Sequence, residues 1–591
     1  MRDVKSLHQT LSEREKTPST VSDMYNALYE ATMRRIHEQG VVDKDLAHKA
    51  ILWVSNAARL LKVQELRCAL AIEPGDEAFD EDGLYHIETI VSVCCGLLTV
   101  EEQSQNVRLV HYTAQEYLSE RKDPKANEEM AITCLTYLCF RNFEPYELPY
   151  PEEGKPYNIR EAYMNWTGLV SSNGKGGCAS YYSTEIAEVP VLHGPDNPTD
   201  AVSFLGYAAE FWIFHSKGCQ EEILSLALNL LCDQHLAANA LIHAKSLHSP
   251  WPSLRLEEDQ STSRATGLHL VAASGLEYIC EKFFEKIQAQ LILDVNVKGD
   301  GRRTPLMWAA HHGNMNIIRL LLCQAPRECK WYGKTIHPLC QRDSQGQTVL
   351  HYAAREGHAA IVQFLQNIEI SRDYICRSES EQYRRDDYAY PTTQSGYHEN
   401  EDFDPGSRAR AESILGHTPI LLAALGNHRD VVRQLSQWDK RSLHHEVMFG
   451  EYPIHMAAQR HGVDVYQLLT GEYKVDPHVC SPKGYHPFVL AADWNNESIV
   501  EYCLDTPGLI GPDQVQQHSN IMQAAIVAAS NWKRLGILKL ILTKIESSLS
   551  NEELDSLVST AVDAGNMESA IFLAALQGER LRTEEKLSVT D

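Results

Sequence analysis

The chain has 591 residues and a net charge of −26, from 54 lysine and arginine residues against 80 aspartate and glutamate residues. Hydrophobic residues make up 43% of the sequence, which is enough for large packed cores and excludes a chain that is disordered throughout. The negative charge repels phosphate backbones and anionic lipids, so nucleic acid and membrane surfaces are not expected partners. Fifteen cysteines in so long a chain do not form a disulfide framework and fit a reducing compartment.

The sequence predicts a soluble protein of the cytoplasm, with the nucleus as the alternative. Its first residues, MRDVKSLHQTLSEREK, lack the apolar stretch of a secretory signal. The apolar stretch IVSVCCGLLTV at 90–100 is far shorter than the roughly 18 apolar residues that a membrane-spanning helix needs.

Residues 1–122 predict several helices followed by a short hairpin, an order that is typical of a winged-helix domain. Helical spacing of apolar residues covers 23–39, two segments within 45–72, and 87–98, and the strand-like VRLVHYT follows at 107–113. A nucleic-acid recognition helix would need lysine or arginine on the third helix, and IETIVSVCCGLL has neither. Nucleic acid binding is therefore not expected of this domain.

Residues 123–250 predict a helical linker domain. Apolar helical segments occur near its two ends, and a loop rich in glycine and serine, at 168–200, separates them.

A short pattern recurs through the second half of the chain. TPLMWAAHHGN from Thr304 returns as TVLHYAAREGH from Thr348, TPILLAALGNH from Thr418, YPIHMAAQRHG from Tyr452 and HPFVLAADWNN from His486. The last three begin 34 residues apart, since 452 − 418 and 486 − 452 both equal 34. This period and the T-P-L-H-x-A pattern resemble the ankyrin repeat family.

The residue types of each copy suit a pair of helices. Thr-Pro opens a helix, because threonine caps free donors and proline lacks the N–H that would be unpaired. Glycine or asparagine ends the first helix, at Gly313, Gly357, Asn427 and Asn495. An apolar second helix follows, and a polar finger leads to the next Thr-Pro.

The ankyrin resemblance predicts about eight helix pairs over residues 260–577, followed by a tail at 578–591. The first copy, from Thr266, has Gly267 where proline is usual, and the copies after His486 lose the Thr-Pro, as terminal repeats often do. A polar, tyrosine-rich insertion at 371–413 separates two copies. It is either a solvated loop or a partner-docking segment.

The first half carries a second resemblance. Residues 110–118, VHYTAQEYL, together with Ile51-Leu52-Trp53 and the segment FLGYAAEFW at 204–212, are similar to the winged-helix and linker portion of fungal NACHT-ankyrin (STAND-type) proteins. That family usually has V-H-F-S-V-x-E-Y-L at the first of these places. The resemblance implies a mainly α protein, with an ankyrin-repeat solenoid in the C-terminal half on an N-terminal winged-helix and helical base.

That family places a P-loop NTPase before the winged helix, whereas this chain begins where such a module would end. The nearest P-loop string, Gly333-Lys334-Thr335, has Glu328 where the first glycine is required. No nucleotide site and no ATP-driven switching are therefore expected of this chain.

The 26 histidines do not predict a metal or catalytic site. His269, His351 and His455 stand at the histidine of T-P-L-H, where we expect the imidazole to bond turn backbone between repeats. The adjacent pairs 311–312 and 444–445 point about 100° apart on a helix, which does not suit one shared metal. No catalytic residue, cofactor or metal is expected.

The expected site is a protein-binding surface made by fingers and first helices. For the large apolar side chains, packing between repeats is the alternative. The residues expected to contact a partner are Lys298, Arg302, Arg303, Arg342, Gln345 and Lys483 in fingers, and Trp308, Tyr352, Met456 and Trp494 near the first helices.

The predicted function is that of a non-enzymatic scaffold or regulator that binds proteins, of unknown identity, through its repeats. One alternative is an enzyme or accessory protein, for example of secondary metabolism, with a pocket where the base meets the solenoid. The other is a fragment, or the split partner, of a NACHT NTPase signalling protein. A fold alone does not decide among them.

Overall fold

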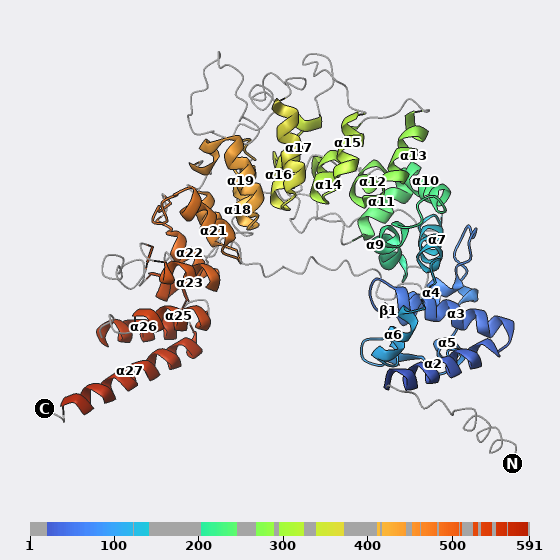
Figure 1. Ribbon diagram of the computed structural model, residues 1–591, viewed down its shortest axis with the longest axis horizontal. Coiled ribbons are helices and arrows are strands. Elements are labelled where there is room, and N and C mark those ends of the chain that lie inside the picture. The colour runs from blue at the N-terminus through green and yellow to red at the C-terminus, as the bar shows by residue number, and fades with distance from the viewer. Residues whose placement is uncertain are drawn as a thin grey trace, which may run out of the picture. The chain divides into compact units, whose positions relative to one another are not determined.

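The protein is described by a computed structural model in two compact units (Figure 1). The first unit contains the elements up to residue 288, and the second contains those from residue 295 onward. The residues that the structure describes are 21–121, 123–140, 203–244, 267–288, 295–323, 338–370, 410–413, 416–444, 452–460, 462–481, 484–506, 509–510, 524–529, 534–545, 551–563 and 565–588.

The first unit begins with the predicted winged-helix arrangement. Strands β2 and β3 form the hairpin and β1 joins it, in the antiparallel order β1-β3-β2, with Val107 opposite both Leu61 and Val100. Leu61 and Val107 are buried, as are Leu66 and Ile90 from the helices behind the sheet. The elements are α2 (Val21–His37), α3 (Val41–Asn56), β1 (Leu61–Lys62), α4 (Val63–Ala71), the 3-10 turn η1 (Glu81–Gly83), α5 (Ile87–Val93), β2 (Leu98–Glu101), β3 (Asn106–Leu109) and α6 (Tyr112–Ser119).

The helices α7 (Ala126–Leu138) and α9 (Leu205–Ser216) pack directly on this domain. Trp53 of α3 meets Phe204 and Tyr207 edge-on, with ring centroids 5.6 and 5.9 Å apart. The Tyr207 hydroxyl accepts a hydrogen bond from Ala58 N at 3.1 Å and lies 3.0 Å from His215 Nε2. Burial lowers the pKa of His215 to about 4. The region predicted as a linker is thus tied to the winged helix by a shared core.

A further helix pair, α12 (Gly267–Ser274) and α13 (Glu277–Gln288), packs in the first unit against α10 (Leu224–Cys232) and α11 (Gln234–His243). Gly267 approaches the backbone of Leu231 so closely that a Cβ at this position would overlap the Leu231 carbonyl. This contact explains the glycine in the place of the usual proline. The pair predicted as the first repeat therefore packs, by its contacts, on helices of the first unit.

The second unit is a series of helix pairs, and its first helices begin at the copies of the repeated pattern. Proline is the first residue of four of the first helices, and Thr304 Oγ1 accepts a hydrogen bond from Met307 N at 3.4 Å. The helices are α14 (Pro305–His311), α15 (Met315–Cys323), α16 (Val349–Arg355), α17 (Ala359–Ile370), α18 (Pro419–Leu425), α19 (Arg429–Trp438), α20 (Pro453–Ala458), α21 (Asp464–Gln467, continued as a π-helix at Leu468–Glu472), α22 (Pro487–Asp493), α23 (Glu497–Asp505), α25 (Leu535–Ile545), α26 (Asn551–Asp563) and α27 (Met567–Ser588). Short 3-10 turns lie at Asp300–Arg302, Pro338–Cys340 and Lys440–His444.

The alanine pairs lie where neighbouring first helices meet. Contacts run from α14 to α16, from α16 to α18, from α18 to α20 and from α20 to α22, and Figure 1 shows α14, α16 and α18 in this order. Small side chains allow the helices to approach closely, as the sequence predicts. The buried pairs are Ala309 and Ala310, Ala353 and Ala354, Ala423 and Ala424, Ala457 and Ala458, and Ala491 and Ala492.

Two predicted segments lie wholly or mostly outside the described residues, and a third differs from its prediction. The loop at 168–200 lies outside the described residues, as does the insertion at 371–413 apart from its last four residues. Where the sequence predicts a tail from 578 onward, helix α27 continues to Ser588.

Candidate protein interface

Two histidines of the repeat pattern join one repeat to the next. His351 Nδ1 accepts a hydrogen bond from Thr348 N at 3.0 Å, which leaves the proton on Nε2, and Nε2 donates to His417 O at 3.1 Å. His455 does the same with Tyr452 N and Tyr485 O, both at 3.1 Å. The predicted role of the histidine in T-P-L-H is confirmed at both positions, and these imidazoles are structural.

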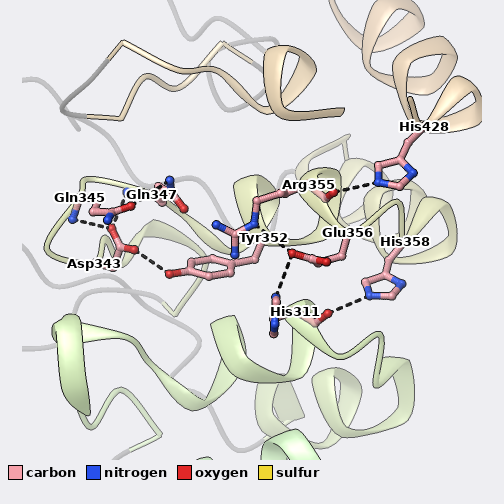
Figure 2. Close-up of polar contacts among 9 residues, drawn as sticks. All are labelled: His311, Asp343, Gln345, Gln347, Tyr352, Arg355, Glu356, His358 and His428. Atoms are coloured by element: carbon pink, nitrogen blue, oxygen red, sulfur yellow. Dashed lines mark hydrogen bonds and ion pairs between the residues drawn. The ribbon is translucent and has the colours of Figure 1, made fainter. Parts of the chain in front are cut away.

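A second set of histidines lies at the other end of the first helices (Figure 2). His358 Nε2 donates to His311 O at 2.9 Å, and His428 Nε2 donates to Arg355 O at 2.8 Å. Each bond satisfies a carbonyl at the end of the preceding first helix, which has no partner within its own helix. Hydrogen bonds thus join neighbouring repeats at both ends of the first helices, next to the fingers.

The finger at 338–348 is organised around the buried carboxylate of Asp343 (Figure 2). Asp343 Oδ1 accepts hydrogen bonds from Gln345 N at 2.9 Å and Gln347 N at 2.7 Å, and Oδ2 accepts from the Tyr352 hydroxyl at 2.7 Å. Burial raises the pKa of Asp343, although these bonds and Arg303 oppose the rise. The carboxylate fixes the turn and holds Tyr352.

Two guanidinium groups flank the Tyr352 ring. The Cζ of Arg355 lies 4.9 Å from the ring centroid, and that of Arg303, from the preceding finger, lies 5.9 Å away. Arg355 Nε donates to Glu356 Oε1 at 3.0 Å, and His311 Nδ1 lies 3.1 Å from the same oxygen. Burial alone would raise the pKa of Glu356, but His311 and Arg355 hold it at about 2. Glu356 is therefore paired with both Arg355 and His311 beneath the fingers.

Neighbouring fingers lie side by side. Ser344 N donates to Gly301 O at 2.8 Å, which joins the finger at 338–348 to the one at 295–304. This bond brings five of the six predicted finger residues into one region. They are Lys298, Arg302 and Arg303 on one finger and Arg342 and Gln345 on the other.

The predicted finger residues differ in how freely they could meet a partner. Arg302 is exposed, and Lys298, Arg303 and Gln345 are half-buried. Arg342 is engaged within the unit, because its Nη1 donates to Gly346 O at 3.0 Å and to Glu412 O at 2.6 Å. These residues stay candidates for partner contact, with Arg302 the most accessible.

The predicted large side chains lie deeper. Trp308, Tyr352 and Met456 are buried, at 6%, 2% and 0% exposure, which agrees with the alternative of packing between repeats. Trp494 is half-buried, and Lys483 lies outside the described residues.

The sequence-based selection missed the polar residues beneath the fingers, namely Asp343, Arg355, Glu356 and His358. A signal for Asp343 was present, because an aspartate five residues before Thr348 can accept from the turn N–H groups that follow it. Arg355 and Glu356 gave no such signal.

A small pocket is lined by Leu339, Thr348, Val349, Leu350, Leu365, Ala411 and Trp438, none of which titrates. Within the described part of the chain, no group of three or more His, Cys, Asp or Glu side chains could hold a metal ion. Among the described helices, none is long and apolar enough to cross a membrane.

Two parts of the chain match known families. Residues 255–373 match the ankyrin repeats, as three copies, and residues 35–133 match the winged helix domain of GPI inositol-deacylase, which is found in NACHT-family proteins. Each match covers less than half of the chain, so it identifies a domain and not the whole protein. No curated protein matches the chain. The predicted fold is confirmed: the protein is mainly helical, with an N-terminal winged helix and ankyrin repeats in the C-terminal half.

Proposed function

We propose that the protein is a non-enzymatic scaffold or regulator that binds partner proteins through the fingers of its ankyrin repeats. The observation that carries the proposal is the joining of the fingers at 295–304 and 338–348 by the bond from Ser344 N to Gly301 O. Exposed and half-buried polar side chains stand on these fingers, while the groups beneath them are hydrogen-bonded to one another. Such a fixed surface loses little conformational entropy on binding.

The proposal also includes a role for the winged-helix domain. Helix α5, IETIVSV, has no lysine or arginine, so it lacks the charges that a nucleic-acid recognition helix needs. The domain instead shares its core with α7 and α9. We infer that it has a structural role within the first unit, and that the protein acts in the cytoplasm.

A second candidate function is favoured by the winged-helix match. A domain of this type in NACHT-family proteins accompanies an NTPase, and the protein would then be the partner of a NACHT NTPase on a separate chain. This candidate specifies the partner of the same surface and leaves the proposed mode of binding unchanged.

The test uses a photo-crosslinking amino acid placed at two positions of the full chain. Gln345 is on a finger, and Gln363 is an exposed residue of the second helix α17. We expect the Gln345 variant to crosslink in cell extract to a protein that Gln363 does not reach, and the purified pair to bind in a titration. Equal crosslinking from both positions, or no binding by the purified pair, would contradict the proposal.

A further inference from the structure

Four fingers of the second unit share one pattern of backbone hydrogen bonds. In each finger, the N–H of a first residue donates to the carbonyl of the residue four positions later. The N–H of the residue three positions later donates back to the carbonyl of the first residue. The first kind of bond joins Gly299 to Arg303, Asp343 to Gln347, Ser413 to His417 and Ser481 to Tyr485, at 2.8 to 3.0 Å. The second joins Arg302 to Gly299, Gly346 to Asp343, Gly416 to Ser413 and Gly484 to Ser481, at 2.8 to 3.1 Å.

The residue that donates back is left-handed in all four fingers, and in the finger at 295–304 the preceding Gly301 is left-handed as well, with φ of 64°. Gly346, Gly416 and Gly484 occupy the position in three fingers, with φ of 74°, 74° and 81°. In the finger at 295–304 the residue is Arg302, with φ of 56°. An L-residue with a side chain is strained in this region, whereas glycine is not. The finger therefore holds an exposed arginine at a cost to its own stability.

The same finger also lacks the side-chain cap of the others. Asp343 Oδ1 accepts from Gln347 N, Ser413 Oγ from His417 N, and Ser481 Oγ from Tyr485 N, at 2.7, 3.1 and 3.1 Å. The equivalent residue of the first finger is Gly299, which has no side chain to accept from Arg303 N. The finger at 295–304 thus lacks both the glycine at the position of Arg302 and the side-chain cap that the other three fingers have.

The replacement concentrates positive charge. The finger at 295–304 has three basic residues, Lys298, Arg302 and Arg303, and one acidic residue, Asp300, in a chain whose net charge is −26. Lys298 is half-buried, and burial together with the charge of Arg302 lowers its pKa. Asp343, the one carboxylate of the finger at 338–348, opposes this lowering of the pKa but already accepts three hydrogen bonds. Arg302 therefore repels Lys298, whose positive charge is already disfavoured by burial.

We propose that the finger at 295–304 is a docking site for an acidic segment of a protein partner, whose carboxylates pair with Arg302 and Lys298. The inference rests on the proposed function and names the chemistry of its partner. Backbone strain of this kind is held by the surrounding structure and is common at binding sites. A carboxylate between the two cations would relieve their repulsion and gain charge-assisted hydrogen bonds.

An acidic peptide fits this finger better than nucleic acid does. The net charge of −26 repels a polyanion as it approaches over the whole surface, whereas a short acidic segment on a folded partner meets mainly the local charge. The basic residues occupy one turn and not a long groove that could follow a phosphate backbone.

The test measures the binding of a fluorescein-labelled peptide of alternating glutamate and serine, of about twelve residues, to the full chain by fluorescence anisotropy. Arg302→Gly restores the turn glycine of the other fingers and removes the charge, so it should keep or raise the melting temperature and yet weaken binding by about threefold or more. Lys298→Gln should weaken binding similarly. Arg302→Lys keeps the charge, and Arg429→Gln removes an exposed arginine of α19, so both should bind as the unchanged chain does.

The probes decide the chemistry of the partner. A glutamine-serine peptide should not bind, and added salt should weaken the glutamate peptide. Stronger binding of a glutamine-phosphoserine peptide or of single-stranded DNA, or an equal loss in Arg429→Gln, would overturn the inference. If a crosslinked protein partner binds Arg302→Gly unchanged, the docking site is refuted and the proposed function stands. If no protein partner is found, the proposed function fails as well.

Discussion

His428 of one repeat fills the space beside Gly357 of the preceding repeat. A Cβ at residue 357 would lie closer to the His428 ring than real Cβ atoms come to their neighbours, and Gly357 has φ of 79°. The ring takes this place because its Nε2 donates to Arg355 O at 2.8 Å, two residues before the glycine. The position that ends the first helix therefore favours glycine for two reasons. Its backbone is left-handed, and the histidine of the next repeat occupies the space that a Cβ would need.

Gly357→Ala should destabilise the second unit. The left-handed backbone alone costs an L-residue about 1–2 kcal/mol, and the displacement of His428 adds the loss of an inter-repeat hydrogen bond. Urea unfolding followed by circular dichroism measures the change. Gly471→Ala is the matched control, because it lies in the helical segment Leu468–Glu472 with nothing within 4 Å of a new Cβ. Equal effects of the two substitutions would contradict the role of His428.

Gly267→Ala should destabilise the first unit by a different mechanism. Its Cβ would overlap the Leu231 carbonyl, and backbone cannot move aside as a flexible side chain can. We expect the melting temperature of the unit to fall by several degrees, since helix α12 would have to separate from α10. Differential scanning calorimetry would measure it.

The control for this substitution is Gly206→Ala in α9. A Cβ there meets nothing within 4 Å, and alanine favours helix over glycine by about 1 kcal/mol. The two changes should therefore move the melting temperature in opposite directions. A Gly267→Ala protein as stable as the unchanged chain would show that α12 does not approach α10 as described.

Much of the fold could be predicted from the sequence because the repeat signals are local. A proline at the helix start and the Ala-Ala pair recur in a fixed order, and the structure places a helix start at the prolines and helix contacts beside the alanine pairs. The partner of a helix pair is not local information. Nothing in the α12 segment, GLHLVAAS, shows that its neighbour is α10, although Gly267 in the place of proline marks the exception.

The candidate site could be predicted only in part. Charged finger tips such as Arg302 are exposed because the turn projects them, and this follows from the repeat pattern. The burial of Tyr352 does not follow, since it depends on Asp343 from its own finger and on Arg303 from the preceding one. An aromatic residue near a helix start can face solvent or the next repeat, and only the contacts decide.

Tyr352→Phe tests the buried link between finger and helix. The substitution removes the donor to Asp343 Oδ2 and leaves that oxygen buried without its partner, which should cost about 1–3 kcal/mol. Chemical denaturation gives the free energy of unfolding. Tyr112→Phe is the control, because Tyr112 is 67% exposed and should be nearly neutral. If the two variants were equally stable, the hydroxyl of Tyr352 would not hold the finger.

The repeats should lose stability as the pH falls from about 6.5 towards 4. Burial, with the charge of Arg342, lowers the pKa of His351 to about 3, and burial lowers those of His417 and His455 to about 4. Between these values and the ordinary 6.5, the unfolded chain binds protons that the folded chain does not, so acid favours unfolding. Above pH 6.5 the imidazoles are neutral in both states and their contribution is fully present.

The slope of the unfolding free energy against pH identifies the histidines that cause the loss of stability in acid. Each such histidine contributes up to about 1.4 kcal/mol per pH unit, which urea titrations at several pH values between 7.5 and 5 can resolve. His417→Gln copies Gln347, the equivalent residue of the neighbouring finger, and should make the pH dependence shallower by one histidine. His235→Gln, at an exposed position of α11, should leave it unchanged. A His417→Gln protein with the full slope would show that His417 is not neutral in the folded repeats.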